Sequence, residues 1–475
     1  MLRSFSLVLT LVVGMSASFS QHSAERRFAS RVSQESLRTN VRSLVRLGNR
    51  WGGTLSGDKA AEFVASRLRR YGLEVEVIED PPRLVYDHSD WILKVASPTR
   101  LRRLFRHEWL AGYSPSVPVS GGTLVDLESD PPASELTGVV VLTERFVPGD
   151  LYDDLVAQGV AAILSFAPAD SDSYSDWSLI THLNAVEDNP IPLYNISFRN
   201  GLRLRKELAG GTEIRIEFSA TTKMGPGSPK TVIGTMKGSS DTSRIICAHG
   251  DSDAGGPGAD DNASGVAGVL ELAGTFSRMV TEGILPAPRE SIKFIVWGSE
   301  YYSTEHFVKG LSEDIHKIAS VINFDEIGFG STRNCVYFES NDIPHNEDLL
   351  HVLNAVGEDY AGKRGFWPEA TTNPSQGGTD SYVFFPEYLE KLDVPPALIP
   401  SVTIYTAAWN KSRTIPQTPG WTSGAWKGHP DSVTIDFSPY YHSSRDIPAL
   451  TTEKEPFNMV WAVKAAGIAL IRLAW

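Results

Sequence analysis

The sequence has few cysteines for its length, with only Cys247 and Cys335 among 475 residues. Two cysteines are too few for a disulfide-stapled scaffold, and too few for a zinc site built from cysteine alone. They allow either one disulfide bridge or two buried free thiols, and the sequence does not decide between these alternatives.

The sequence also lacks an excess of basic residues. It contains 44 lysines and arginines against 57 aspartates and glutamates, so its net charge is −13. This acidic balance argues against nucleic acid as the main partner. Hydrophobic residues make up 41% and charged residues 21% of the chain, which is ordinary globular composition. A disordered chain, a coiled coil and a collagen are therefore excluded.

Beyond its N-terminus, the sequence has no uninterrupted apolar run of the roughly 18 residues that a membrane-spanning helix needs. The nearest candidate, Phe457–Trp475, is interrupted by Lys464 and Arg472 and is predicted to form an amphipathic helix. We therefore expect no stable membrane insertion.

The first twenty residues form a distinct segment. A short cationic start with Arg3 precedes the apolar run Phe5–Val13, and small residues follow from Gly14 to Ser20. This pattern is typical of a secretory signal peptide, and cleavage is expected near Ser18–Ser20. A signal anchor is the alternative. The sequence predicts an exported protein, either secreted or periplasmic.

The C-terminal half alternates expected strands with expected helices. Such alternation indicates an α/β fold with a mostly parallel central sheet and helices on both of its faces. Strands are predicted at Arg244–Ala248, Ile292–Trp297, Val321–Asp325 and Val402–Tyr405, and helices at Ala263–Val280 and Phe457–Leu473.

The N-terminal half shows two kinds of pattern. A helix over Gly57–Tyr71 and a strand over Glu74–Ile78 are predicted first, since apolar residues recur at helical spacing and then alternate. From Pro98 to Thr222 the chain is rich in short strands, turns and acidic loops, which indicates an inserted module. Within it we expect a strand at Gly138–Thr143, a helix at Leu151–Gly159 and a strand at Val160–Phe166. The predicted organisation is a signal peptide (1–20), an N-terminal part of the main domain (21–97), a strand-rich insert (98–222) and the remaining main domain (223–475).

Polar residues follow the expected parallel strands. In a sheet of this kind, ligands bind beyond the carboxyl ends of the strands, so these residues should meet at one site. Two histidines together with carboxylates form a donor set that suits zinc. The residues are His249, Asp251, Asp261, Glu300, Asp325 and, far downstream, Tyr441 and His442.

These segments resemble the two-zinc aminopeptidases, a family that also contains glutamate carboxypeptidases and transferrin receptors. The resemblance implies the zinc exopeptidase fold. It rests on His249–Ser252, Gly258–Gly265, Trp297–Glu300, Asn323–Gly328, Gly378–Phe385 and Tyr441–Asp446. The insert resembles a protease-associated domain, with matching strand patterns at Leu136–Leu142, Gly159–Leu164 and Ile191–Ser197.

The resemblance implies two zinc ions and assigns their ligands. His249 and Asp325 would hold the first ion, with Asp251 orienting His249. His442 would bind the second ion, and Asp261 would bridge both. The insert contributes none of these residues, so we expect it to narrow access to the site without taking part in the chemistry.

The resemblance also implies that Glu300 is the general base and that Tyr441 hydrogen-bonds the oxyanion formed during hydrolysis. One departure affects this assignment. The family has two adjacent glutamates at this position, whereas here Glu300 is followed by Tyr301. Either Glu300 is the base and the second ion has only two protein ligands, or Glu300 binds metal and no base remains. Glu305 and Glu326 are nearby carboxylates that could compensate, and a single zinc ion is an alternative to two.

We therefore expect a secreted zinc exopeptidase, an aminopeptidase in the first instance, that hydrolyses peptides through a metal-activated water. The alternatives are a catalytically degenerate binding protein on the same scaffold and a one-metal enzyme. Trp409, Trp421 and Trp426 lie in a Pro/Gly-rich stretch that forms either a cleft wall or a packed surface loop. The sequence leaves open carboxypeptidase or dipeptidase activity, side-chain preference and oligomeric state.

Overall fold

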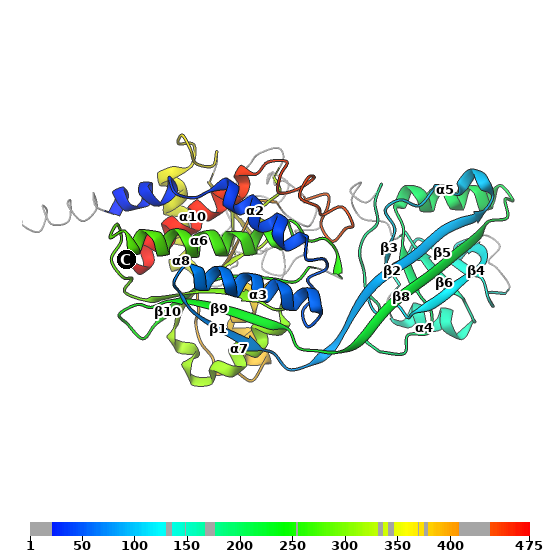
Figure 1. Cartoon of the computed structure of the whole chain (residues 1–475), viewed down its shortest axis with the longest axis horizontal. Helices are drawn as coiled ribbons and strands as arrows, with labels where there is room; N and C mark the ends of the chain where they lie inside the picture. The colour runs from blue at the N-terminus through cyan, green and yellow to red at the C-terminus, as the bar shows by residue number, and fades with distance from the viewer. Residues whose placement is uncertain are drawn as a thin grey trace, which may run out of the picture.

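In the computed structural model, the chain folds into two lobes (Figure 1). The structure describes residues 21–129, 135–147, 149–166, 176–252, 255–330, 336–340, 346–368, 370–374, 379–407 and 438–475. The predicted signal peptide, Cys335, Gly378 and the three tryptophans Trp409, Trp421 and Trp426 lie outside these residues. The long strands β2 (Arg83–Ser97) and β8 (Arg215–Gly227) run from one lobe into the other.

The larger lobe is built on an eight-stranded sheet with the order β1-β9-β11-β10-β12-β15-β13-β14. Its central strands β11, β10, β12 and β15 are parallel, as the sequence predicts. The sheet as a whole is mixed, because β9 pairs antiparallel with β1 and β11, and β13 pairs antiparallel with β15. The strands are β1 (Glu74–Glu79), β9 (Lys230–Met236), β10 (Ser243–His249), β11 (Ser291–Trp297), β12 (Ile318–Phe324), β13 (Val336–Ser340), β14 (Ala370–Pro374) and β15 (Ser401–Tyr405).

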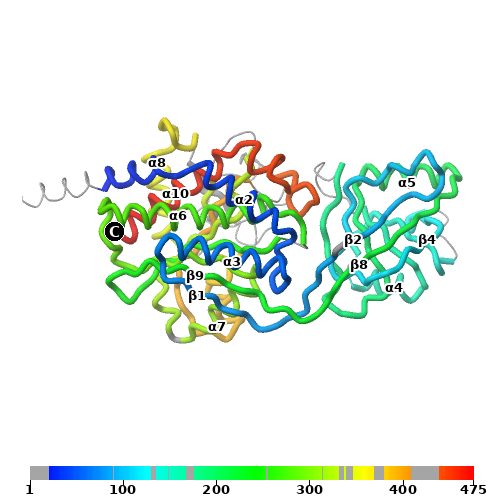
Figure 2. Tube along the Cα trace, viewed as in Figure 1, coloured from blue at the N-terminus to red at the C-terminus, as the bar shows by residue number. Residues whose placement is uncertain are grey.

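Helices cover both faces of this sheet, which confirms the predicted α/β layering (Figures 1 and 2). One face carries the larger core, formed with α2 (Gln34–Val45), α3 (Leu55–Arg70), α6 (Ala263–Thr281), α8 (Glu347–Tyr360) and α10 (Phe457–Ala474). The other face carries a smaller core formed with α7 (Tyr302–Leu311) and α9 (Pro386–Lys391). The predicted helices at α3, α6 and α10 are confirmed to within a few residues.

Helix α10 is buried on more sides than the predicted amphipathic helix would be. Its small residues allow close packing: a Cβ atom on Gly467 would lie 2.0 Å from a ring atom of Phe28. Among the described residues, α10 is the helix long and apolar enough to cross a membrane, by length and composition only. Because 72% of that stretch is buried inside the protein, α10 has the environment of a core helix.

The smaller lobe is built on a seven-stranded sheet with the order β2-β8-β4-β5-β6-β7-β3. The predicted strand, helix and strand near residue 150 are present as β5, α4 and β6. The sheet extends beyond the predicted insert at both ends, because β2 begins at Arg83 and β8 ends at Gly227. Its remaining elements are β3 (Trp109–Leu110), β4 (Val117–Asp126), β5 (Val140–Thr143), α4 (Gly149–Ala157), β6 (Ala162–Ser165), β7 (Leu193–Asn195) and α5 (Phe198–Ala209).

A buried ion pair links the N-terminal and C-terminal helical segments of the larger lobe. The guanidinium of Arg472 donates to Glu25 at 2.9 and 3.2 Å, and Glu25 is only 1% exposed. Breaking a buried pair by removing one partner costs about 3–5 kcal/mol, because the remaining charge stays buried. The Arg472→Met substitution should therefore lower the free energy of unfolding of this lobe by roughly 3 kcal/mol.

Denaturant unfolding followed by tryptophan fluorescence and circular dichroism measures this loss. The double variant Arg472→Met with Glu25→Gln should be more stable than the single variant, because it does not bury a carboxylate that has lost its arginine partner. A single variant within ~0.5 kcal/mol of wild type would contradict the assignment.

Candidate metal centre

The candidate site lies at the carboxyl ends of three adjacent parallel strands. In β10, His249 is aligned with Trp297 of β11, and Cys247 is aligned with Asn323 of β12. His249 is thus the last residue of its strand, and Asp325 directly follows β12. Cys247 is a buried free thiol beneath this edge.

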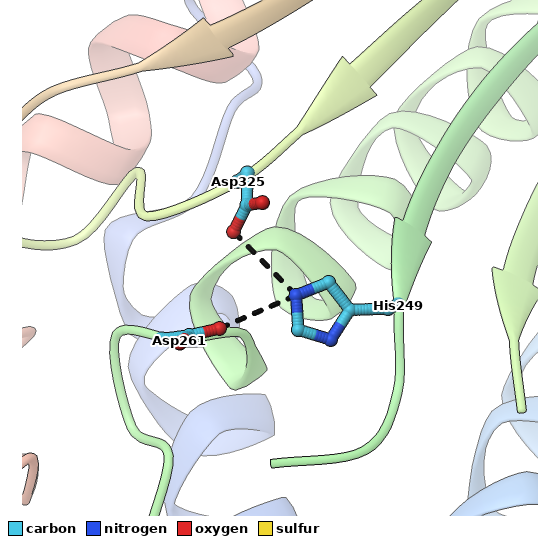
Figure 3. Close-up of side chains that lie close together, drawn as sticks. All are labelled: His249, Asp261 and Asp325. Atoms are coloured by element: carbon cyan, nitrogen blue, oxygen red, sulfur yellow. Dashed lines mark ion pairs between the residues drawn. The ribbon is translucent and has the colours of Figure 1, made fainter. Parts of the chain in front are cut away.

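Three of the predicted residues come together as a compact group. His249, Asp261 and Asp325 are all buried and each offers a ligand atom within 4.8 Å of the others. The Nε2 atom of His249 lies 3.2 Å from Asp261 Oδ1 and 3.6 Å from Asp325 Oδ1 (Figure 3). One imidazole nitrogen and two carboxylate oxygens thus converge on a single point.

Asp251 fixes the orientation of His249, as the sequence predicts. Its carboxylate lies 3.2 Å from Nδ1 of His249, so Nε2 is left facing the two aspartates. The same carboxylate accepts hydrogen bonds from the Ser299 hydroxyl at 2.9 Å and from the Glu300 amide at 3.0 Å. A histidine held in this way has a fixed tautomer and ring orientation, which is the usual arrangement behind a metal-binding histidine.

Asp261 lies between the two histidines of the predicted set. Its Oδ1 faces His249, and its Oδ2 lies 3.0 Å from Nε2 of His442. The carboxylate of Asp446 accepts hydrogen bonds from the amides of Asp260 and Asp261, at 2.8 and 3.0 Å, and so fixes this loop. Although burial raises the pKa of Asp261, the two histidines lower it below its usual range. Asp261 therefore has the two-sided geometry of a bridging ligand.

Asp325 is oriented by the neighbouring strand end. Its Oδ2 accepts a hydrogen bond of 2.6 Å from the Thr379 hydroxyl, which in turn accepts one of 3.2 Å from the Asn323 amide group. The other carboxylate oxygen is directed at His249. Burial lowers the pKa of His249, but the charge of Glu300 and the three aspartates around the ring raise it well above the usual value.

Tyr301 does not occupy a ligand position. Its backbone has a φ of +54°, its amide donates to Asp380 at 3.0 Å, and its ring stacks 6.3 Å from that of Tyr388 in the smaller core. Glu305, one of the two predicted substitutes, accepts a hydrogen bond of 2.6 Å from the Tyr388 hydroxyl. Glu326, the other one, is buried, but it is not part of the three-residue group. Glu305 is therefore engaged in the smaller core, whereas Glu326 lies close to the candidate ligands, since the charges of Asp261 and Asp325 are among the causes that raise its pKa.

Glu300 and Tyr441 both lie beside the group. Burial is the main cause that raises the pKa of Glu300. The charges of His249 and Asp325 also act on this pKa, so both side chains lie close to Glu300. The ring of Tyr441 stacks on that of His442, with 3.6 Å between the centroids. Both predicted catalytic residues are thus placed next to the candidate ligands.

Arg50 is a site residue that the sequence did not reveal. It is only 1% exposed, and its guanidinium donates to the carbonyls of Gly250, Pro257 and Gly258, at 3.2, 2.9 and 2.7 Å. Burial lowers its pKa to about 10. These carbonyls belong to the loop between His249 and Asp261, so Arg50 holds that loop closed. An arginine before a helix gives no sequence signal that it is buried.

Comparison with known proteins agrees with this geometry. Residues 231–465 match the model of peptidase family M28, and this stretch includes every candidate ligand. This part of the chain belongs to peptidase family M28. Over 310 residues the chain is 27% identical to a Mycobacterium tuberculosis protein named "Probable lipoprotein aminopeptidase LpqL", and the match covers 62% of this chain. It spans 58% of that relative's length.

Solved structures of the M28 fold superpose on nearly the whole chain. A Peptidase M28 precursor from Shewanella amazonensis aligns with a TM-score of 0.62 at 18% identity, and the alignment covers 96% of this chain and 97% of that one. A zinc aminopeptidase from Bacillus subtilis aligns with a TM-score of 0.59 at 19% identity, and the alignment covers 93% and 95% of the two chains. The fold of the chain is therefore that of the M28 peptidases.

The role of Arg50 in this M28 site can be tested by removing its charge. In Arg50→Met, three carbonyls lose their donor, and the loop that carries Asp261 is then held by Asp446 without the support of Arg50. Losing an interaction that supports metal ligands typically weakens metal binding ~10–100-fold, and we expect a loss of this size for a divalent ion. The measurement is competition with a chromophoric chelator, with the fold checked by circular dichroism.

Arg46→Met is the matched control, because Arg46 lies four residues upstream and its side chain is exposed. It should bind the ion as tightly as wild type. Equal affinities for both variants would show that Arg50 does not support the site.

Proposed function

We propose that this chain is a zinc-dependent exopeptidase, and an aminopeptidase in the first instance, that acts on peptides. The observation that carries the proposal is the buried group of His249, Asp261 and Asp325, with the carboxylate of Glu300 beside it. The similarity to the Mycobacterium tuberculosis protein, which is named as a probable aminopeptidase, and the fold shared with the Bacillus subtilis zinc aminopeptidase support the same conclusion.

The donor set fits zinc. Catalytic zinc sites have three protein ligands drawn from histidine and carboxylates and keep one position open for water or substrate, which is the composition of this group. Further carboxyl groups lie buried nearby, and burial raises the pKa of both Asp380 and Asp446 to about 7. When bound, zinc lowers the pKa of a coordinated water and polarises the substrate carbonyl.

We propose two zinc positions of unequal strength. The first has three protein ligands, His249, Asp261 and Asp325. The second has two among the described residues, Asp261 and His442, since Tyr301 points away from the site. With fewer ligands, the second position should bind its ion more weakly and exchange it more readily.

The remaining residues of the site act on protons and on the substrate. Glu300 accepts a proton from the attacking water and returns it to the leaving amine, a role for which its raised pKa is suited. Tyr441 is held against the ring of His442, from where its hydroxyl can donate to the substrate oxygen as negative charge develops.

A catalytically degenerate binding protein is the alternative function. In such a protein the candidate ligands would be free to diverge, whereas here His249, Asp261, Asp325 and His442 are all present and face one another. This argues for an enzyme. The predicted signal peptide lies outside the described residues, and export of the chain stays part of the proposal.

Replacing the proposed base should abolish turnover without loss of metal. Glu300→Gln keeps the size of the side chain but cannot accept a proton, so turnover of an aminoacyl p-nitroanilide should fall by at least ~10²-fold. Substrate affinity and zinc content should stay close to wild type. Steady-state kinetics and atomic absorption measure both quantities on the same protein.

Glu358→Gln is the matched control, since Glu358 is exposed on α8 and should tolerate the change without effect. Loss of zinc in Glu300→Gln would mean that Glu300 is a ligand. Normal turnover with full zinc content would rule out both roles.

Removing His442 should separate the two metal positions. His442→Ala leaves the second position with Asp261 alone, so zinc content should fall from two ions to one per chain, and hydrolysis should be lost. The three ligands of the first position should retain their ion. The exposed His351 on α8 provides the control His351→Ala, which should keep both ions and full activity. Full zinc occupancy with unchanged hydrolysis in His442→Ala would refute the assignment.

A further inference from the structure

The insert makes backbone contact with the loop that carries His442. The amide of Ile180 donates to the carbonyl of His442 at 2.8 Å, and the amide of Ser444 donates to the carbonyl of Ser178 at 3.4 Å. These two bonds flank an antiparallel bridge between Leu179 and Ser443. The segment Trp177–Ile180, which lies in the insert, therefore pairs in register with the loop of a candidate ligand.

Side chains reinforce this pairing on both sides of His442. On one side, the ring of Tyr440 lies 5.1 Å from Trp177 of the insert and 5.9 Å from Phe329 of the main lobe. On the other side, the hydroxyl of Ser444 donates to the carbonyl of His107 at 3.3 Å.

The same carbonyl fixes the insert segment. It accepts the amide of Ser178 at 3.2 Å and also its hydroxyl. Two stretches of the insert, at His107 and at Trp177–Ile180, thus converge on one short loop of the main lobe.

His442 adopts a backbone conformation that needs outside support. Its φ is +45°, in the left-handed region that residues other than glycine rarely occupy. Such a conformation persists only where the surroundings determine it, and the Ile180 amide on the His442 carbonyl is one such determinant. The imidazole then points at Asp261, with 3.0 Å between the two side chains.

We infer that the insert is a positioning element for the second metal position: Trp177–Ile180 holds His442 in the orientation that faces Asp261. This inference rests on the proposed function, because it concerns the weaker of the two proposed zinc positions. His107, Trp177 and Ile180 are positioning residues, because the contacts described above join them to residues 440–444 and not to the ligand atoms of the site. By thermodynamic linkage, an ion bound by His442 must in return stabilise the docking of the insert.

The test compares two substitutions at one position. Ile180→Pro removes the amide that donates to His442, while proline remains compatible with extended backbone at the preceding residue. Ile180→Ala removes the side chain and keeps the amide. One backbone hydrogen bond corresponds to roughly a tenfold change in an equilibrium. We expect the affinity for the second zinc ion to fall about tenfold further in Ile180→Pro than in Ile180→Ala, while the first ion is retained.

Hydrogen exchange on the wild-type chain gives a second, independent readout. Adding zinc from one to two equivalents should slow the exchange of the Ile180 amide, because the two sites are coupled, and should leave the amides of β5 and β6 unchanged. This measurement decides the question even if Ile180→Pro fails to fold.

Two results would overturn the inference. One is equal affinity for the second ion in both Ile180 variants. The other is an Ile180 amide whose exchange does not respond to the second equivalent of zinc. If the wild-type chain binds no zinc and cleaves no peptide, the proposed function fails separately. The positioning role is then judged on the exchange of amides 440–444, which should be faster in Ile180→Pro than in Ile180→Ala.

Discussion

The burial of negative charge at one edge of the central sheet is the constraint on which the rest of the structure depends. Asp251, Asp260, Asp261, Asp325, Glu326, Asp380 and Asp446 are each at most 6% exposed. Among the described residues, the basic side chains that face these carboxylates are His249, His442 and the single buried arginine, Arg50. An isolated buried carboxylate is strongly unfavourable, so this edge can persist only with hydrogen bonds, protonation or bound cations to compensate. Much of the local architecture serves that need: Asp446 is held by two amides, Asp325 by a hydroxyl and Asp251 by an amide and a hydroxyl.

Sequence reasoning located the parts of this edge that chain topology dictates. Apolar runs followed at once by a polar residue gave β10, β11 and β12, and parallel strands bring such residues together. That reasoning accounts for His249 and Asp325, which end or directly follow parallel strands, whereas Asp261 and His442 lie on loops and were assigned from the family resemblance. It could not find Arg50, because the carbonyls that bind this side chain are 200 or more residues away along the chain. The antiparallel strands β9 and β13, which lie next to the edge strands β1 and β14, were also missed, since nothing local distinguishes them from parallel strands.

Tyr301, which stands where the family has its second glutamate, affects the chemistry of the site but not the fold. The fold tolerates this tyrosine because the chain turns at a φ of +54° and places the ring in the smaller core, next to Tyr388. The proposed second metal position would then depend on two side chains, one of which lies on a loop that the insert contacts. A site with fewer ligands relies more on how firmly each ligand is held. The lost glutamate and the contact with the insert therefore bear on the same property, the precision with which His442 is held.

The position of α10 has a consequence for how the chain folds as it is made. This helix packs against α2, α6 and α8, and its Arg472 pairs with Glu25, which lies 447 residues earlier in the sequence. The core of the larger lobe cannot close until α10 has been synthesised. The smaller lobe is continuous from Arg83 to Gly227 and has cores of its own, so it can form while the rest is still being synthesised. The chain thus carries a folded insert between two halves of an open sheet until α10 has been made, and a truncation of α10 would leave that insert attached to an exposed apolar surface.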